Sequence, residues 1–290
     1  MIDYGSIKVR IRNLLRDYIH PKQTLVDTTI PLSDGSINYE VAESFIPFSK
    51  QYSSSTPYSL PVDLVCRRVG SPGGDLVVSL RTDFPNFTEI TSKTISATII
   101  PTSIGTVSAT LNFDSMLGSK TRYWLHISHL ATASTVDYYE VGATTLDKYW
   151  SGDLIKREEG GSWSTISGDL AFNCRIKNFI YENYPHHALS PYNFPRIAVD
   201  IVSRPRVIQR VIDSRVAECY FMFQITVYSR YEDELDQLIS LVDKSLFKER
   251  INIEDIIILN PGNLSQVTKV GNVFARALNY EAYIRYINNY

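Results

Sequence analysis

The sequence "RVAECYFMFQITVYSRYEDELDQLISLVDKSLFKE", residues 215–249, contains two periodic patterns of side chains. Before Tyr231 two sets of side chains alternate along the chain, which is typical of a strand whose two faces lie in different surroundings. From Tyr231 the apolar residues recur every three or four positions, which predicts a helix over about 231–249. A long strand that leads directly into such a helix predicts an α+β domain in which the helix covers one face of a sheet.

The segments on either side support this prediction. "RIAVDIVS" (196–203) precedes the long strand, and "DIIILNPGNL" (255–264) and "NVFARALNYEAYIRYI" (272–287) follow the helix. All three are typical of strands, so residues 183–290 are expected to contain two strands, a helix and two strands. The apolar face expected for the helix consists of Leu235, Leu238, Ile239, Val242 and Leu246.

Residues 28–182 have a different composition, rich in Ser, Thr and Gly. Short β-branched or aromatic runs such as "GDLVVSLRT" (74–82) and "TRYWLHISH" (121–129) alternate there with turns. This pattern predicts a β-sandwich, jelly-roll-like in architecture, with almost no helix. The fold class expected for the whole chain is mainly β plus α+β, with the sandwich inserted into the α+β domain or preceding it.

Residues 1–27 bear on the choice between these two arrangements. The apolar stripe of a helix expected over 3–19 consists of Ile7, Ile11, Leu14, Leu15, Tyr18 and Ile19. Its basic residues make membrane-surface binding an alternative, but we expect it to pack on the domain of residues 183–290, since bulky aromatic residues are few. The sandwich is then an insertion. In an alternative arrangement, "RIKNFIYENY" (175–184) takes the place of this helix.

Charge, hydropathy and cysteine usage exclude several functional classes. The 290 residues include 29 basic and 31 acidic side chains, a net charge of −2, whereas a nucleic-acid binder needs a basic excess. No apolar run approaches the roughly 20 residues of a membrane span, and no secretory leader is visible, so we expect a soluble protein made in the cytoplasm. Cys66, Cys174 and Cys219 form no Cys-x-x-Cys pair, which indicates buried free thiols.

No group of side chains predicts catalysis or a metal site. His126 and His129 lie three residues apart on one expected strand, so their rings point to opposite faces. "GSWSTISG" (161–168) lacks the strand-to-helix context of a nucleophile elbow, and "GSPGGD" (70–75) lacks the Lys of a phosphate loop. We therefore expect no enzymatic activity, no metal and no cofactor.

Three motifs occur in order within the expected sandwich, "GSPGGDLVVSLRTD" (70–83), "TRYWLHIS" (121–128) and "GSWSTISGDLAF" (161–172). They resemble those of the choice-of-anchor domain, a carbohydrate-binding-module-like sandwich of surface proteins and of structural proteins of viruses. The resemblance implies adhesion to a glycan or a surface, and Trp163 and Trp150 are the candidate glycan contacts.

These residues also have plain structural interpretations. Trp163 and Trp124 are large enough to fill the core or its rim, whereas a sugar-binding platform requires an exposed ring face. Asp169 is expected to tie a loop through hydrogen bonds to backbone N–H groups.

A second set of matching segments is the hairpin of residues 196–230, the helix "YEDELDQLISLVDKSLF" (231–247) and the strand "VGNVFARALNYEAYIRY" (270–286). It resembles the tail-terminator, or tail-completion, proteins of long-tailed phages and archaeal tailed viruses. The resemblance implies a homo-oligomeric ring, expected to be a hexamer, in the tail or neck of a virion. The implied partners are further copies of the chain, the tail tube protein and a head-completion or neck protein.

The connection "SRPRVIQRVIDSR" (203–215) is too apolar for a free solvated loop. Its arginines are Arg204, Arg206, Arg210 and Arg215. Arginine is favoured in interfaces because its planar fork binds carboxylates through two hydrogen bonds. The acidic residues at the start of the expected helix, "YEDELD" (231–236), are Glu232, Asp233, Glu234 and Asp236, the first three of them in its first turn. We expect the hairpin of one subunit to dock on this helix start of the next, the alternative being the same contact within one chain.

The leading hypothesis is therefore a structural virion protein, a tail terminator whose sandwich decorates the outside of the ring. The competing hypothesis is a glycan-binding adhesion module in which residues 183–290 serve as an anchor. A hydrolase of cell-wall sugars would need a close pair of carboxylates, and no such pair can be singled out. A ring in solution favours the terminator, whereas a glycan-binding monomer favours the adhesion module.

Overall fold

The computed structural model describes residues 4–48, 57–115, 117–118, 121–146, 149, 152–176, 178–182, 194–203, 206–210, 216–249 and 256–287. The chain forms two compact units, His20–Lys177 and the combination of Met1–Ile19 with Asn178–Tyr290. We call the first the sandwich unit and the second the α+β unit. The fold is mainly β, as the sequence predicted.

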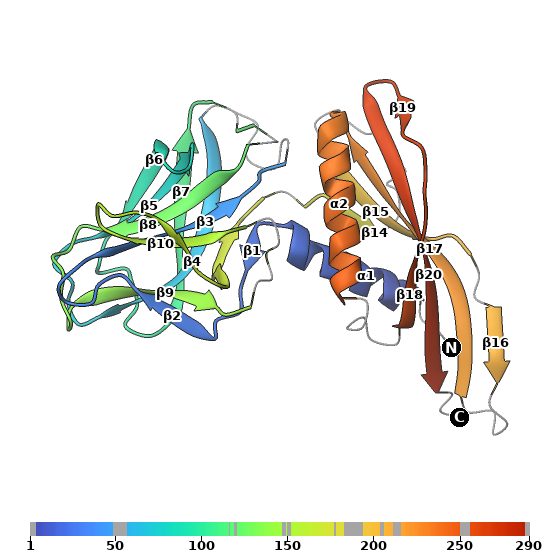
Figure 1. Ribbon diagram of the computed structural model, residues 1–290, viewed down its shortest axis with the longest axis horizontal. Coiled ribbons are helices and arrows are strands. Elements are labelled where there is room, and N and C mark those ends of the chain that lie inside the picture. The colour runs from blue at the N-terminus through green and yellow to red at the C-terminus, as the bar shows by residue number, and fades with distance from the viewer. Residues whose placement is uncertain are drawn as a thin grey trace. The chain divides into compact units, whose positions relative to one another are not determined.

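The strands of the sandwich unit form two antiparallel sheets (Figure 1). Their bounds are β1 Lys22–Gln23, β2 Thr28–Pro31, β3 Tyr39–Phe45, β4 Tyr58–Val69, β5 Leu76–Thr82, β6 Thr88–Ile95, β7 Gly105–Phe113, β8 Tyr123–His129, β9 Tyr138–Thr144, β10 Leu154–Glu158, β11 Ser164–Thr165, β12 Asp169–Leu170 and β13 Phe172–Cys174. One sheet has the order β1-β13-β4-β9-β12, with β2 beside β9 and β7 beside β4. The other has the order β11-β10-β3-β8-β5-β6.

The core of the sandwich unit lies between the two sheets. The buried residues of β4 are Leu60, Val62, Leu64 and Cys66. They alternate with more exposed positions, as expected for a strand with one face in a core. Cys66 and Cys174 are buried free thiols, as the sequence indicated, and burial raises the pKa of Cys66 to about 12. The side chain of Cys219 lies outside the described residues.

The elements of the α+β unit are α1 Tyr4–Ile19, β14 Ile180–Glu182, β15 Arg196–Ile201, β16 Arg206–Arg210, β17 Val216–Ser229, α2 Glu232–Glu249, β18 Ile256–Leu264, β19 Thr268–Val270 and β20 Val273–Ile287. Its sheet has the order β14-β15-β17-β20-β18, with β16 beside β17 and β19 beside β20. The pair of β14 and β15 is parallel and the others are antiparallel. The four expected strands and the expected helix are confirmed, and β14, β16 and β19 are additional strands.

Helix α2 covers one face of this sheet, as the sequence predicted (Figure 1). The sheet residues buried on that face include Phe221, Phe223, Ile225 and Val227 of β17. All five apolar residues expected on the inner face of α2 are buried. Helix α1 packs on α2, β14 and β15. Within the described part of the chain, neither helix has the length and apolar character needed to cross a bilayer.

The sandwich unit is an insertion whose two ends lie close together. At its base, Cys174 N donates to Pro21 O at 3.0 Å. In the α+β unit, Arg16 Nη2 at the end of α1 donates to Ile180 O in β14 at 2.9 Å. The chain therefore leaves the α+β unit and returns to it at one place.

The unit boundaries differ from those expected at residues 28 and 182. The first strand, Lys22–Gln23, already pairs with β13 of the sandwich. Ile180–Glu182 pairs instead with β15 of the α+β unit. Short segments of two or three residues carry no periodic signal, so only their pairing partners assign them to a unit. Because Ile180–Glu182 is a strand, the alternative helix over 175–184 is excluded there.

Candidate functional site

The sheet of the α+β unit contains a ribbon that is longer than the helix covering it. Strand β17 has 14 residues, all paired with β20, and spans about 46 Å at 3.3 Å per residue. Helix α2 has 18 residues and spans about 27 Å. Figure 1 shows the lower end of the ribbon, with β16 beside it, extending past the helix. At the end of the ribbon away from the start of α2, β16 pairs with β17 on one side and β18 pairs with β20 on the other.

Part of the basic connection of residues 203–215 forms a strand, β16, that pairs with β17. Residues 196–201 pair with 223–228, and Arg206–Arg210 then pairs with 217–220. Arg206 and Arg210 therefore lie on β16, at the end of β17 remote from α2's first turn. Arg204 and Arg215 lie outside the described residues.

The acidic first turn of α2 is only partly available to a partner. Glu232 and Asp233 are exposed, but Glu234 is fully buried. Ser229 Oγ donates to Glu234 Oε2 at 2.5 Å and accepts from Tyr231 N at 3.0 Å. The prediction that Glu234 contacts a neighbouring subunit is wrong, because its carboxylate is used to hold the strand-to-helix turn.

The alternative of a contact between β16 and this helix start within one chain is also wrong. Arg206 pairs with Tyr220, whereas α2 begins just after Ser229. These two positions of β17 are nine residues apart, about 30 Å along a strand. An arginine side chain cannot bridge that distance.

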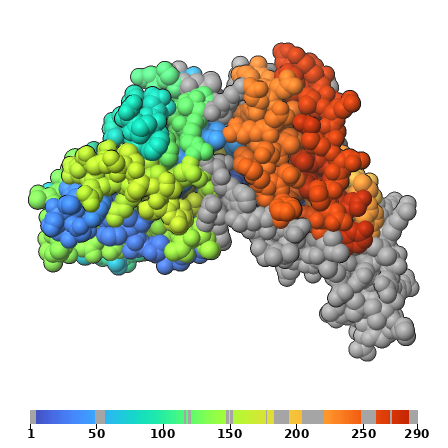
Figure 2. Space-filling view, in the orientation of Figure 1, coloured from blue at the N-terminus to red at the C-terminus, as the bar shows by residue number. Residues whose placement is uncertain are grey.

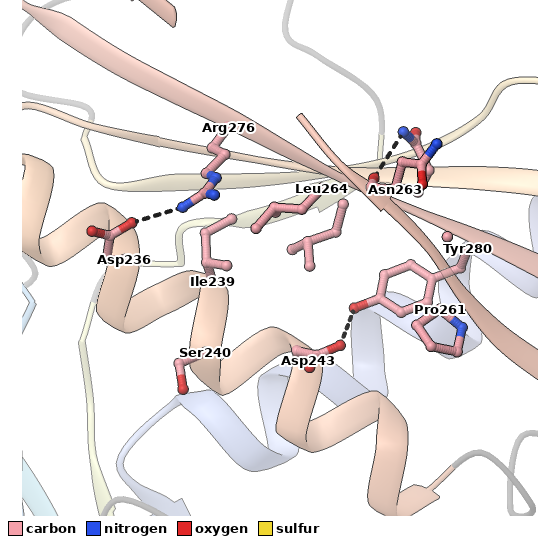
Figure 3. A pocket seen from close by; sticks show the side chains of 12 residues that line it. Asp236, Ile239, Ser240, Asp243, Pro261, Asn263, Leu264, Arg276 and Tyr280 are labelled. Carbon is pink, nitrogen blue, oxygen red and sulfur yellow. Dashed lines mark hydrogen bonds and ion pairs between the residues drawn. The ribbon is translucent and has the colours of Figure 1, made fainter. Parts of the chain in front are cut away.

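A groove of about 440 Å³ lies between α2 and strands β18 and β20 (Figure 3). The lining residues are Asp236, Ile239, Ser240, Asp243, Pro261, Gly262, Asn263, Leu264, Arg276, Leu278, Asn279 and Tyr280. Figure 2 shows the side chains of α2, in orange, at the surface beside those of the final strands, in red. The groove lies wholly within the α+β unit.

A β-bulge shapes the strand wall of this groove. Pro261 pairs with Tyr280, but the next pair is Leu264 with Leu278, so β18 has one extra residue there. Asn279 Nδ2 donates to Asn263 O at 3.2 Å and holds the bulge. A Cβ on Gly262 would lie 2.7 Å from the Asn279 carbonyl oxygen, so glycine permits this close approach. No sequence signal other than "NPGN" (260–263) could have indicated the bulge.

The groove has an apolar floor and an acidic rim. Ile239, Leu278 and Tyr280 are at least nine-tenths buried, whereas Leu264 is 44% exposed. Arg276 Nη1 lies 3.2 Å from Asp236 Oδ1. Figure 3 shows a second contact, in which Tyr280 OH donates to Asp243 Oδ1 at 3.1 Å.

These contacts leave the rim negatively charged. Among the described residues, Asp236 has a cationic partner, while Asp243 is bonded to a neutral phenol. Burial, and then the neighbouring carboxylate of Asp243, raise the pKa of Tyr280, so this phenol stays neutral. The rim can therefore accept a cation next to an apolar surface.

Trp163, the candidate glycan contact, belongs to a cluster on the outer face of the six-stranded sheet. The cluster consists of Ala42, Phe87, Trp124, Ile155 and Trp163, apart from the core between the sheets. Trp163 is partly exposed, its ring lies 4.9 Å from that of Phe87, and Arg157 lies 4.5 Å above its face. Trp163 therefore packs at the rim of this cluster, and its role as a glycan contact stays a prediction. Trp150 lies outside the described residues.

A strained loop adds an exposed ring to this cluster. Asp83 and Phe87 have φ of 58° and 51°, a left-handed conformation that is uncommon for residues other than glycine. Phe84 between them is 48% exposed and stacks on Trp124 with 5.1 Å between ring centroids. Aromatic surface is thus available to a ligand at Phe84 as well as at Trp163.

A buried polar network that the sequence did not reveal lies under these rings. His126 Nδ1 lies 3.1 Å from Ser79 Oγ, and His126 Nε2 lies 2.9 Å from Glu40 Oε2. Arg157 Nε donates to the same Glu40 oxygen at 2.7 Å. Burial lowers the pKa of His126. Burial alone would raise the pKa of Glu40, but its bonds to His126 and Arg157 outweigh this and hold it at about 2.

The series Ser79, His126 and Glu40 has the composition of a hydrolase triad but lacks access. Ser79 is 0% and His126 is 1% exposed, so a substrate cannot reach the hydroxyl. Arg81 Nε also donates to Ser79 Oγ at 2.9 Å. The network therefore anchors the rings above it.

Two smaller predictions about the sandwich are confirmed. His129 Nε2 lies 2.8 Å from Leu32 O on the core side, opposite His126, so the two histidines do not share a site. Asp169 Oδ2 accepts a hydrogen bond from Tyr149 N at 2.9 Å, so the Asp169 side chain ties the backbone at Tyr149, as the sequence predicted for a loop. No group of three or more His, Cys, Asp or Glu side chains with metal-binding geometry occurs within the described ranges.

No protein-family model matches the chain, and no curated protein matches it significantly.

Proposed function

We propose that this chain is a structural virion protein, a tail terminator that forms a ring between the tail tube and the head or neck. The observation that carries the proposal is the ribbon of β17 and β20, which extends past α2 and has β16 on one side and β18 on the other. Its partners are further copies of the chain, the tail tube protein and a head-completion or neck protein.

The two different sides of the ribbon suit a ring. A closed ring of identical subunits requires that one surface bind a different surface on the next copy. Edge strands are the parts of a sheet most prone to such association. β16 and β18 differ in sequence and lie on opposite sides of the same ribbon, so a head-to-tail contact is geometrically natural.

Oligomeric state tests this proposal. The purified full-length chain is expected to show the mass of a ring, for which six copies is our expectation, by light scattering after gel filtration. Negative-stain images should show rings, and the protein should lie at the head-proximal end of the tail on virions. A monomer at all accessible concentrations would contradict the proposal.

A second candidate function, glycan-binding adhesion by the sandwich unit, is favoured by the exposed aromatic surface at Phe84 and Trp163. Sugars stack on such faces, and Trp163 Nε1 is buried without a hydrogen-bond partner among the described residues. Binding to immobilised glycans should be lost in Trp163→Ala and Phe84→Ala. Unchanged binding in both variants, or no binding by the wild type, would contradict this function.

A further inference from the structure

We infer that the groove between α2 and β18 is the docking site for β16 of a second copy of this chain. The inference rests on the proposed self-association and names the surfaces that form it. The sequence suggested the helix start, including Asp236, as the acceptor of the basic segment, but Glu234 is buried there. Of these acidic residues, Asp236 lines the groove, together with Asp243 further along α2, and apolar surface lies beside both.

The composition of β16 complements the groove. β16 is "RVIQR" (206–210), in which two arginines enclose two aliphatic residues. The rim of the groove carries Asp236, which is paired with Arg276, and Asp243, which accepts from the neutral Tyr280, so its net charge is negative. Beside it lies apolar surface that includes the half-exposed Leu264. Arginine pairs well with carboxylates at interfaces because its guanidinium is planar and weakly hydrated.

The occupant must come from another copy. Within one chain, β17 and β20 lie between β16 and β18, so about 14 Å of sheet separates the two edges. The groove also lies beside residues 276–280 of β20, which pair with the half of β17 next to the start of α2. β16 pairs with the other half of β17. In a head-to-tail contact, β16 of one copy can therefore occupy the groove of the next copy.

Side chains rather than strand pairing mediate this docking. Pro261 on β18 has no N–H to donate, and the bulge at Gly262 and Asn263 interrupts the regular edge. Both features discourage addition of another strand at this position. The groove is therefore expected to bind arginine and aliphatic side chains of β16.

Charge reversal on the full-length chain tests the inference. Asp236→Lys with Asp243→Lys is expected to convert the ring to monomer. Glu232→Lys with Asp233→Lys is the matched control, because it makes the same charge change on exposed positions of the same helix outside the groove. Combining the groove variant with Arg206→Glu and Arg210→Glu should restore the ring.

A peptide of residues 203–215 provides a readout that does not depend on ring formation. Its binding to the Arg206→Glu, Arg210→Glu chain can be followed by fluorescence anisotropy. Adding the two groove substitutions should weaken binding at least about tenfold, since like charges then face each other. The helix-start control should change binding by less than about twofold. If the double groove variant unfolds, Asp243→Lys alone keeps the pair of Asp236 and Arg276.

The outcomes separate this inference from the proposed function. A ring and a peptide affinity that both survive the groove substitutions overturn the inference but leave the ring. A monomeric wild type whose groove binds the peptide supports the docking site and contradicts the ring. A monomeric wild type that does not bind the peptide contradicts both.

Discussion

The outer face of the six-stranded sheet and the groove beside α2 both combine apolar and charged side chains, but they use charge differently. On the sheet face, Glu40 is bonded to His126 and Arg157 beneath aromatic rings. In the groove, Asp236 and Asp243 lie on an exposed rim. Glu40 is paired within its unit and stabilises that unit. Asp236 is paired with Arg276 and Asp243 with a neutral phenol, so the groove keeps a net negative charge at exposed positions beside apolar surface, where a partner can reach it.

The largest expected effect comes from removing the centre of the aromatic cluster. Trp124 is 4% exposed and contacts Phe84 and Phe87. Trp124→Ala should lower the free energy of unfolding of the sandwich unit by about 3–5 kcal/mol, because a large cavity replaces the indole. Chemical denaturation measures this. Phe84→Ala, at an exposed position, is the control, and an equally large loss there would show that the cluster is not centred on Trp124.

The next effect is a pH dependence of the sandwich unit. The lowered pKa of His126 means that the folded unit favours neutral imidazole. The associated stability is present above the unfolded pKa of about 6.5 and is lost as the pH falls. Glu40 acts at lower pH, since its stability is present above 4.5 and is lost as the pH approaches about 2.

Melting temperatures between pH 7 and pH 5 measure the histidine contribution. The wild-type sandwich should melt at progressively lower temperature over this range, and His126→Gln should remove most of the slope. A slope that persists in His126→Gln would assign the dependence to other groups.

A smaller effect is expected in the groove. Tyr280→Phe removes the hydrogen bond to Asp243 and should lower the stability of the α+β unit by about 1 kcal/mol. Tyr231→Phe, at a 49% exposed ring, is the control. A loss of several kcal/mol in the free energy of unfolding of Tyr280→Phe would contradict the contrast with the sheet face. It would show that the polar contacts of the groove stabilise their own unit, as those of Glu40 and His126 do.

The smallest effect is expected from removing the sandwich unit altogether. Its ends are adjacent, so a short Gly/Ser bridge in place of residues 20–177 should leave the melting temperature of the α+β unit and its oligomeric state unchanged. Circular dichroism and light scattering test this. A folded but monomeric α+β unit would place the sandwich in the subunit interface.

The parts of the fold predicted from sequence are those encoded by local periodicity. The alternation through Phe221 and Phe223 and the helical spacing through Leu235 and Leu238 each lie within one continuous segment, and both were confirmed. Backbone geometry repeats every two residues in a strand and about every 3.6 in a helix, so the spacing of apolar residues predicts the type of element without tertiary information. The candidate sites were predicted less well. Trp163 packs at the rim of a cluster, as one interpretation of the sequence had it, but its role as a glycan contact stays a prediction, and Glu234 is buried where the sequence suggested an interface residue.

The sequence by itself therefore determined the long elements, the alternation of buried and exposed residues along them, and the contrast between a β-rich insertion and an α+β frame. Tertiary structure alone decided which charges are buried and which are exposed. Glu40, Ser79 and His126 come from three strands that meet only in the folded sheet. The groove likewise requires α2 to lie beside a bulge in β18. Such sites depend on strand register and on packing between distant segments, for which neither period nor composition carries a signal.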